Sequence, residues 1–196
     1  TNPLLIKIDD EENFKYADLR IMVFGQETNG WFEMSNEVID LCNAYEKFFN
    51  SKTLFVDYHS QFCNGLQKFK EMICAKHPNI NIRFVCNNII KTCVNGKGAP
   101  PEYIYMLEKE YFAVINEEIQ ILKPNILIFF TGPYYDQRII NTFDNIQFEE
   151  IPKFNSRQIA RFSINSNNNC FRTYHPNYLY RIKRALPQHI DDFFKA

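Results

Sequence analysis

Two nearly uninterrupted apolar runs do most to limit what this chain can fold into. They cover residues 19–24 and 126–130, and a turn signal follows each, Gly25 in the first case and the T-G-P sequence of residues 131–133 in the second. Runs without polar alternation are typical of strands buried on both faces, as in the centre of a parallel sheet. We therefore expect an open α/β sheet with helices on both faces.

Between and beyond these runs, the remaining elements are predicted from helical spacing and from strand-like patterns. The expected helices run from the N-cap Ser35 to Phe49 and over residues 65–75, 102–122 and 178–194; the further strands cover residues 80–90, 146–164 and 171–174, with a loop at 163–169. The order β-α-α-β-α-β-α-β-β-β-α predicts a single three-layer α/β/α domain over residues 1–196, with a central mostly parallel sheet. Residues 1–17 are expected to form an N-terminal extension of that domain.

The charges are distributed unevenly along the chain. The whole sequence has a net charge of −1. Residues 151–196 carry eight basic and two acidic residues, a net +6, whereas the rest carries 14 basic and 21 acidic residues, a net −7. A basic end on an acidic body fits a polyanion that touches one face, although a solvated helix surface is the simpler interpretation of charge alone.

The sequence also predicts where the protein resides. No apolar run approaches the roughly 20 residues that a membrane helix needs. The first 12 residues are mixed and acidic, without the basic-then-apolar layout of a signal peptide. The six cysteines include no C-x-x-C pair, so we expect reduced, mostly buried thiols. We therefore expect a cytoplasmic protein, of the bacterial cytosol or nucleoid type, with no membrane association.

Polar residues follow three of the predicted strands, at the edge where open α/β sheets bind ligands. Glu27 supplies a carboxylate after the first strand and His175 an imidazole after the last, and together these groups can perform acid/base chemistry. Asn88 lies near the end of a buried strand, where an unpaired amide costs a few kcal/mol. Each residue also has a structural alternative: Glu27 as a helix cap, Asn88 as a tie to a loop, and His175 as part of a His-Pro turn.

Taken together, the three segments resemble the motifs of the uracil-DNA glycosylase superfamily, over roughly residues 19–185. The family's first motif is a strand followed by G-Q-D-P-Y or a variant, and residues 25–27 are G-Q-E. Its base-reading asparagine ends a strand, in one branch as N-V-V-K, and residues 88–91 are N-I-I-K. Its last motif in the iron–sulfur branch is T-Y-H-P-x-x-L-x-R, and residues 173–181 match it at every fixed position.

The resemblance implies a uracil-DNA glycosylase-like fold and a role for each matching residue. Glu27 would hold the attacking water and His175 would stabilise the departing base anion, so these two are the catalytic candidates. The base would be bound by Gln26, Asn88 and Phe62. DNA would be contacted by Leu179, which takes the place of the family's wedge, and by Arg181, Lys183 and Arg184.

The sequence departs from the family in three ways. Glu27 stands where relatives often carry Asp or Asn, and an extra methylene moves the carboxylate by roughly an ångström, which can cost about 100-fold in rate. Thr28 and Asn29 replace a Pro-Tyr pair whose tyrosine excludes the thymine methyl group. The cysteine set of the iron–sulfur branch is absent, although Cys93 is near one expected place, so we expect no cluster. Two further aromatic candidates for the pocket are Phe55, as a rival to Phe62, and Trp31.

These observations predict a monofunctional DNA glycosylase that hydrolyses the N-glycosidic bond of uracil, or of a related damaged or modified base, after base flipping. We expect base-excision DNA repair, with single- or double-stranded, uracil-containing DNA as the partner. We also expect no metal, no other cofactor and a monomer. Two alternatives stay open: a catalytically weak or inactive DNA- or base-binding protein on the same fold, and an enzyme that takes nucleosides or nucleotides as small molecules.

Overall fold

The computed structural model describes residues 3–28, 37–50, 60–92, 94 and 99–181, and every structural statement below concerns these residues. The elements are α1 (Glu11–Lys15), β1 (Leu19–Gly25), α2 (Val38–Asn50), α4 (Gln61–Lys76), β2 (Ile82–Asn88), α5 (Glu102–Tyr111), α6 (Ile115–Leu122), β3 (Ile126–Phe129), the 3₁₀ helix η1 (Pro133–Tyr135), α7 (Asp136–Thr142), β4 (Glu149–Glu150), β5 (Ile159–Ile164), β6 (Asn167–Thr173) and α8 (Pro176–Arg181).

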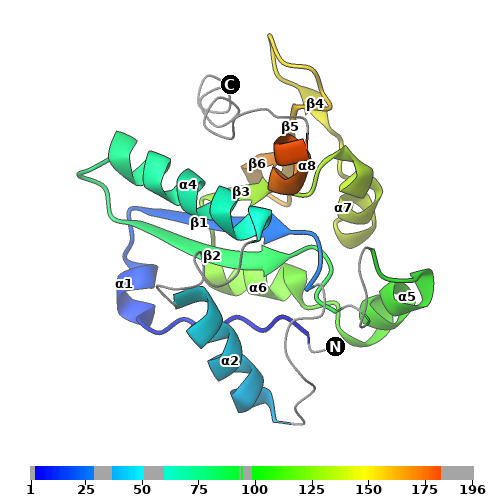
Figure 1. Ribbon diagram of the computed structural model, residues 1–196, viewed down its shortest axis with the longest axis horizontal. Helices are drawn as coiled ribbons and strands as arrows, with labels where there is room; N and C mark the ends of the chain where they lie inside the picture. Colours follow the sequence, from blue (N-terminus) through cyan, green and yellow to red (C-terminus); the bar gives the residue numbers. More distant parts are fainter. Residues whose placement is uncertain (1–2, 29–36, 51–59, 93, 95–98, 182–196) are drawn as a thin grey trace.

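One six-stranded sheet runs through the molecule in the order β2-β1-β3-β6-β5-β4. The first four strands are mutually parallel, whereas β5 runs antiparallel to both β6 and β4. Helices from both halves of the chain surround this sheet (Figure 1). The α/β class and the mostly parallel sheet predicted from the sequence are therefore confirmed.

Strand β1 shows why an apolar run forms the centre of this sheet. Residues 21–25 are all buried, because neighbouring side chains point to opposite faces and a helical layer covers each face. Met22 and Phe24 belong to one hydrophobic cluster, here named the α6-side core, and Ile21 and Val23 to another, the α4-side core. Figure 1 shows α4 along one face of the sheet and α6 on the opposite side. The helices contribute Ile115 and Ile119 to the α6-side core, and Phe62, Leu66, Phe69 and Ile73 to the α4-side core.

The predicted N-terminal extension, as far as the structure describes it, packs onto the domain. Leu4 is 1% exposed and its backbone N–H donates to the Lys91 carbonyl oxygen at 2.8 Å, so this segment is tied to the chain that follows β2. The Asp10 side chain caps α1 by accepting from the Asn13 N–H, and Phe14 enters the α6-side core. Residues 3–17 are therefore part of the folded domain, to whose core they contribute Leu4, Phe14 and Ala17.

The single long helix predicted over residues 102–122 is wrong. The chain leaves the helical conformation at Phe112, whose φ is −145°, and a separate helix begins at Ile115. The two helices have different surroundings: α5 buries none of its residues, whereas α6 packs two isoleucines onto the sheet. Glu108 anchors α5 by accepting from the backbone N–H groups of Lys91 and Thr92. One straight helix would have to place Glu108 beside Lys91 and Thr92 and, at the same time, pack the two isoleucines onto the sheet.

The loop predicted at residues 163–169 is also wrong. Strands β5 and β6 form a hairpin in which Ile164 pairs with Asn167, and Asn165 in the turn has a φ of 53°, a value that asparagine tolerates better than most residues. The Asn167 amide donates to the Pro124 carbonyl oxygen at 3.0 Å. The polar composition therefore reflects the exposure of this end of the hairpin and does not mark a loss of strand structure.

Candidate functional site

The ends of four parallel strands bring the predicted motifs to one edge of the sheet. Gly25 pairs in register with Asn88, so the last residues of β1 and β2 are neighbours. β3 lies on the other side of β1 and β6 lies beyond β3. The Gly132 N–H donates to the Thr173 carbonyl oxygen at 2.9 Å, which joins the ends of β3 and β6. The residues that follow these strands therefore share one edge.

The strand order reverses at β1, which makes this edge a ligand-binding position of the open α/β type. From β1 the chain first adds β2 on one side and later adds β3 on the other. The Gln26 side chain crosses the resulting switch point, because its Nε2 donates to the Thr131 carbonyl oxygen at 2.7 Å. Gln26, which we expected to bind the base, therefore uses a side-chain donor to join the ends of β1 and β3.

Phe62 lies near two other predicted site residues, Asn88 and His175, on the α4 side of this edge. A Cβ added at Gly25 would lie 2.5 Å from Asn88 Oδ1 and 3.0 Å from Phe62 Cζ, so only a glycine lets these groups approach. The rings of Phe62 and His175 stack with centroids 5.6 Å apart and an interplanar angle of 22°. Residues from β2, from α4 and from the turn after β6 thus form one cluster, here named the Asn88 cluster and comprising Asn88, Phe62 and His175.

The Asn88 amide is a buried donor with an unmet hydrogen bond. The residue is 2% exposed, and its Nδ2 has no hydrogen-bond partner in the described part of the chain. Leaving such a donor unpaired costs about 1–3 kcal/mol, so folded proteins keep few of them. Its position near the Phe62 ring, which stacks on the His175 imidazole, points to a ligand as the missing partner.

His175 is held as a neutral hydrogen-bond donor. Its Nδ1 accepts from the Asn177 backbone N–H at 3.1 Å, so the single proton of the neutral ring resides on Nε2. Burial, together with the positive charge of Arg181, lowers the pKa of His175 to about 4. At neutral pH the ring therefore offers an uncharged N–H, which stabilises an anion that forms beside it.

Glu27 lies at the same edge but is held on the α6 side. Its Oε2 accepts a hydrogen bond of 2.5 Å from the Tyr135 hydroxyl. Burial raises the pKa of Glu27, and the bond from Tyr135 opposes that rise. Within the described residues, no hydrogen bond joins Glu27 to Asn88 or His175. Glu27 follows Gly25 by two residues, which limits the separation of their Cα atoms to roughly 7 Å.

The residues that we predicted to contact DNA are less fully described. Leu179 is 1% exposed, because α8 packs beside α4, and so it does not project from the surface as a wedge must. Arg181 is exposed at the end of α8. The described part of the predicted final helix is α8 alone. Four predicted residues, Lys183, Arg184, Phe55 and Trp31, lie outside the described residues.

Two basic side chains of the motif regions serve the fold instead. Arg172 makes a bidentate ion pair with Asp136 at 2.8 and 3.0 Å, which ties β6 to α7. Lys91, in the N-I-I-K motif, is fully buried on the α6 side, where its Nζ donates to Glu118 Oε1 at 2.6 Å and to Asn87 Oδ1 at 2.8 Å. The Asn87 Nδ2 donates in turn to Glu118 Oε2 at 2.8 Å. These three residues are here named the Lys91 network.

Two residues of this edge were not predicted from the sequence. Tyr135 binds Glu27, and Thr131 is buried with a hydroxyl that has no hydrogen-bond partner in the described chain. Both belong to the T-G-P-Y-Y segment directly after β3. The signal that was available is the position of this turn at the carboxyl end of a central strand, where polar groups tend to face a ligand.

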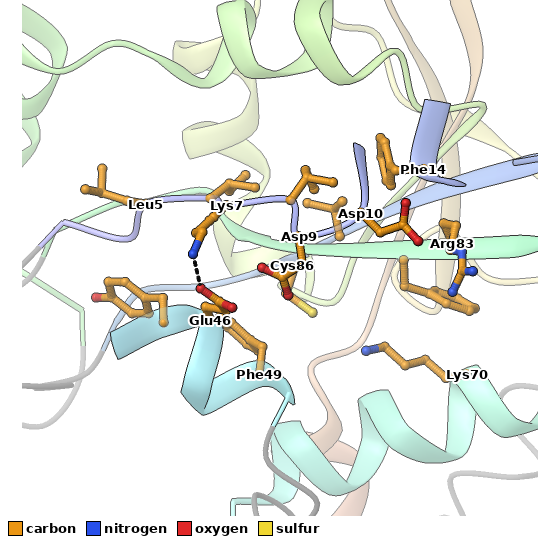
Figure 2. A pocket seen from close by; sticks show the side chains of 15 residues that line it. Leu5, Lys7, Asp9, Asp10, Phe14, Glu46, Phe49, Lys70, Arg83 and Cys86 are labelled. Carbon is orange, nitrogen blue, oxygen red and sulfur yellow. Dashed lines mark hydrogen bonds and ion pairs between the residues drawn. The ribbon is translucent and has the colours of Figure 1, made fainter. Parts of the chain in front are cut away.

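Two cavities lie elsewhere in the molecule, and neither lining includes a predicted site residue. One, of about 260 Å³, lies beside β2 between residues 5–10 and helices α2 and α4, where Lys7 forms an ion pair with Glu46 (Figure 2). The other, of about 720 Å³, lies between the N-terminal segment and α6. Among the described residues, no group of three or more His, Cys, Asp and Glu side chains is placed to hold a metal ion, and no helix is long and apolar enough to cross a membrane.

The described cysteines are free thiols, and Cys93 lies outside the described residues. Comparisons with models of protein families, with curated proteins and with solved structures found no match.

Proposed function

We propose that this protein is a monofunctional DNA glycosylase with a uracil-DNA glycosylase-like fold, which hydrolyses the N-glycosidic bond of uracil or a related damaged base. The observation that carries the proposal is the Asn88 cluster, in which an unpaired buried amide donor, an aromatic ring and a neutral imidazole meet at the switch-point edge of the sheet. This set of groups suits a planar heterocycle with carbonyl oxygens. The motif resemblance, in the same order along the chain, supports the same substrate.

The chemistry assigns a task to each group. Breaking the bond between the sugar and the base leaves negative charge on the base and positive charge on the sugar. The Nε2–H of neutral His175 donates to the base oxygen where the negative charge gathers. Asn88 donates through Nδ2 to a base carbonyl and can accept from a base N–H, which distinguishes uracil from cytosine. Glu27, as a carboxylate, orients the water that attacks the sugar and offsets its charge.

The proposed reaction ends with an abasic site and an intact strand. A glycosylase that also cuts the strand uses an amine nucleophile, and the Asn88 cluster contains none. Lys91, the lysine of the N-I-I-K motif, lies on the opposite side of the sheet and forms an ion pair with Glu118. Water is therefore the nucleophile in this proposal.

Substrate entry requires movement at the Asn88 cluster. Asn88 is 2% exposed, and the 5.6 Å between the Phe62 and His175 centroids leaves no space for a base between those rings. A flipped base must therefore stack beside Phe62 after the covering residues shift, in addition to the few kcal/mol that extrusion from a duplex costs. Leu179 reaches DNA only if α8 moves away from α4.

The test is incubation of enzyme in excess with uracil-containing oligonucleotides, single- and double-stranded, followed by alkali to cleave abasic sites. We expect strand cleavage with the natural sequence, and a loss of about 10²- to 10³-fold in rate for Asn88→Ala and for His175→Ala. Asn168→Ala and His77→Ala, which change exposed residues of the same types, should keep the natural rate. Absence of abasic product on both substrate forms would rule out the proposal for uracil, and a panel with hypoxanthine, xanthine and mismatched thymine would extend the test to related bases.

A second candidate function is supported by one observation. The Glu27 carboxylate is already engaged by Tyr135, and burial raises its pKa, which are features of a group withdrawn from water activation. A base- or DNA-binding protein without hydrolysis would have this arrangement. It predicts salt-dependent binding of uracil-containing DNA that Asn88→Ala weakens, with no abasic product at any enzyme concentration.

A further inference from the structure

The turn after β3 fixes the position of one tyrosine. Gly132 has a φ of 74°, which favours glycine, and its backbone N–H bonds to Thr173 of β6. The chain then forms η1, in which the Tyr135 N–H donates to the Gly132 carbonyl oxygen at 3.1 Å. The Tyr135 ring enters the α6-side core and is 9% exposed. Both ends of this residue are thus constrained, and its hydroxyl has a defined location.

The Tyr135 hydroxyl lies against the Glu27 carboxylate. The 2.5 Å bond from the Tyr135 hydroxyl to Glu27 Oε2 joins residues 108 apart in the sequence. A hydrogen bond to a charged acceptor is about twice as strong as one between neutral groups. The Glu27 side chain can rotate about three bonds, and the bond selects one of its conformations. The second carboxylate oxygen, Oε1, has no hydrogen-bond partner within the described residues and can bind another group.

A second layer lies behind the tyrosine. The Arg138 guanidinium lies over the Tyr105 ring, 3.1 Å from its centroid, and forms an ion pair of 2.8 Å with Glu102. Tyr105 interacts electrostatically with both Glu27 and Tyr135, and burial raises its pKa to about 12. Besides Glu27, the groups that act electrostatically on Tyr135 are Tyr105 of α5 and Arg138 of α7. Tyr105 in turn is affected by Glu102 and Glu108 of its own helix.

We propose that Tyr135 is the positioning residue of this site, which holds one oxygen of the Glu27 carboxylate so that the other can bind the attacking water. This inference rests on the function proposed above. It also accounts for the glutamate at a position where relatives often carry aspartate. The extra methylene carries the carboxylate to Tyr135, and a shorter side chain, about 1.5 Å back, would lose the bond.

The same bond favours the ionised form of Glu27. Burial raises the pKa of Glu27 and the Tyr135 hydroxyl lowers it, so removal of the hydroxyl must raise the pKa further. A hydrogen bond to a charged group corresponds to roughly one pH unit or more. A protonated Glu27 cannot accept a hydrogen bond from water at the same oxygen that carries the proton, so the lost bond and the lost charge act in the same direction.

The first test reads the carboxylate directly and needs no activity. Protein labelled with ¹³C at the glutamate carboxyl carbons is titrated by NMR, and Glu27→Gln identifies the Glu27 signal. We expect Tyr135→Phe to raise the Glu27 midpoint by about one pH unit. Tyr134→Phe, which removes the hydroxyl of the neighbouring exposed tyrosine, should leave the midpoint unchanged. An unchanged midpoint in folded Tyr135→Phe would overturn the inference.

The second test connects the bond to the reaction. If the natural sequence excises uracil, Tyr135→Phe should lower kcat about 10-fold at neutral pH, leave KM unchanged and move the acid limb of the pH–rate profile upward by the same amount as the NMR midpoint. Glu27→Asp should add little further loss in a Tyr135→Phe background, because the bond is already absent. Additive losses, or an unmoved acid limb, would overturn the inference while excision itself remained established. A raised NMR midpoint in a protein without excision would instead refute the proposed function and leave the contact between Tyr135 and Glu27 established.

Discussion

At the end of β2, buried polar side chains on the two faces of the sheet differ in how many of their hydrogen bonds are made. On the α6 side, Asn87 uses both ends of its amide, toward Lys91 and Glu118, and its Oδ1 also accepts from the Asn88 backbone N–H. On the α4 side, the Nδ2 donor of the adjacent Asn88 has no partner among the residues that the structure describes. The two residues have the same side chain and almost the same exposure, 1% and 2%.

The difference teaches how to separate a structural polar group from a functional one in this molecule. A closed set of hydrogen bonds, like that of the Lys91 network, stabilises the fold and has no capacity left for a ligand. An open donor costs free energy of folding, and such a cost is characteristic of sites that a ligand completes. Sequence position alone cannot make this distinction, because Asn87 and Asn88 are neighbours on one strand.

The largest expected effect comes from removing the charge of Glu118. Lys91 is fully buried, and burial lowers its pKa while Glu118 opposes that shift. Glu118→Gln leaves the ammonium without its counter-charge, so we expect the free energy of unfolding to fall by about 3–5 kcal/mol. Urea denaturation followed by circular dichroism measures this change. Glu117→Gln, at an exposed position on the same helix, should stay within about 0.5 kcal/mol, and a similar small effect at Glu118 would show that the network is not structural.

The next effect is a pH dependence that originates at His175. Its folded-state pKa of about 4 lies below the ordinary value of 6.5, so the unfolded chain takes up a proton first as the pH falls. The stability that this residue confers is complete above pH 6.5 and is lost between pH 6.5 and 4, by about 2–3 kcal/mol at pH 4.5. Between pH 7 and 4.5, we therefore expect the natural protein to lose that much more unfolding free energy than His175→Gln. Equal losses would contradict a buried neutral imidazole.

The neighbouring asparagines offer the most direct comparison. Asn87→Ala breaks three hydrogen bonds of a buried network, so we expect a loss of about 2–3 kcal/mol in unfolding free energy. Asn88→Ala removes an amide whose donor is unpaired, so we expect a change within about 1 kcal/mol, together with the loss of activity proposed above. Both variants are measured by the same denaturation experiment. If Asn88→Ala proved the more costly of the two, the assignment of Asn88 to a ligand would have to be abandoned.

The smallest effect tests the close approach at Gly25. An added Cβ meets Asn88 Oδ1 at 2.5 Å and Phe62 Cζ at 3.0 Å, so Gly25→Ala should cost about 1–2 kcal/mol through overpacking. In an Asn88→Ala background, the clash with Asn88 Oδ1 is absent, so the loss of unfolding free energy caused by Gly25→Ala should fall to under about 1 kcal/mol. A double-mutant cycle measures the coupling. Additive costs would show that Gly25 and Asn88 do not contact each other as described.

Part of this structure was predictable from local sequence. The apolar runs at β1 and β3 identified strands buried on both faces, and the turn residues after them marked the ligand-binding edge. The location of Asn88 and His175 at the same edge was also predictable, because the carboxyl ends of parallel strands meet there. Phe62, which lies in α4, was expected only from the motif resemblance.

Other parts depend on tertiary contacts that local patterns do not encode. The break between α5 and α6 contains no glycine or proline that would predict it. It follows from two different attachments, since α5 is tied through Glu108 to Thr92 and α6 packs on the sheet. The burial of Leu179 depends on the packing of α8 against α4. The bond between Tyr135 and Glu27 needs the Gly132 turn to aim a ring at a residue 108 positions earlier. Motif spacing specified positions along the chain but not these orientations.

The strand order has a consequence for synthesis on the ribosome. β1 leaves the exit tunnel about 100 residues before its partner β3, as the register of Ile21 with Ile126 shows. Until then, one edge of an apolar strand has no neighbour, and nascent chains in that condition aggregate or recruit chaperones. Polypeptides that terminate between β2 and β3 should therefore accumulate as insoluble material, whereas chains that include β3 supply the missing neighbour of β1 and should not.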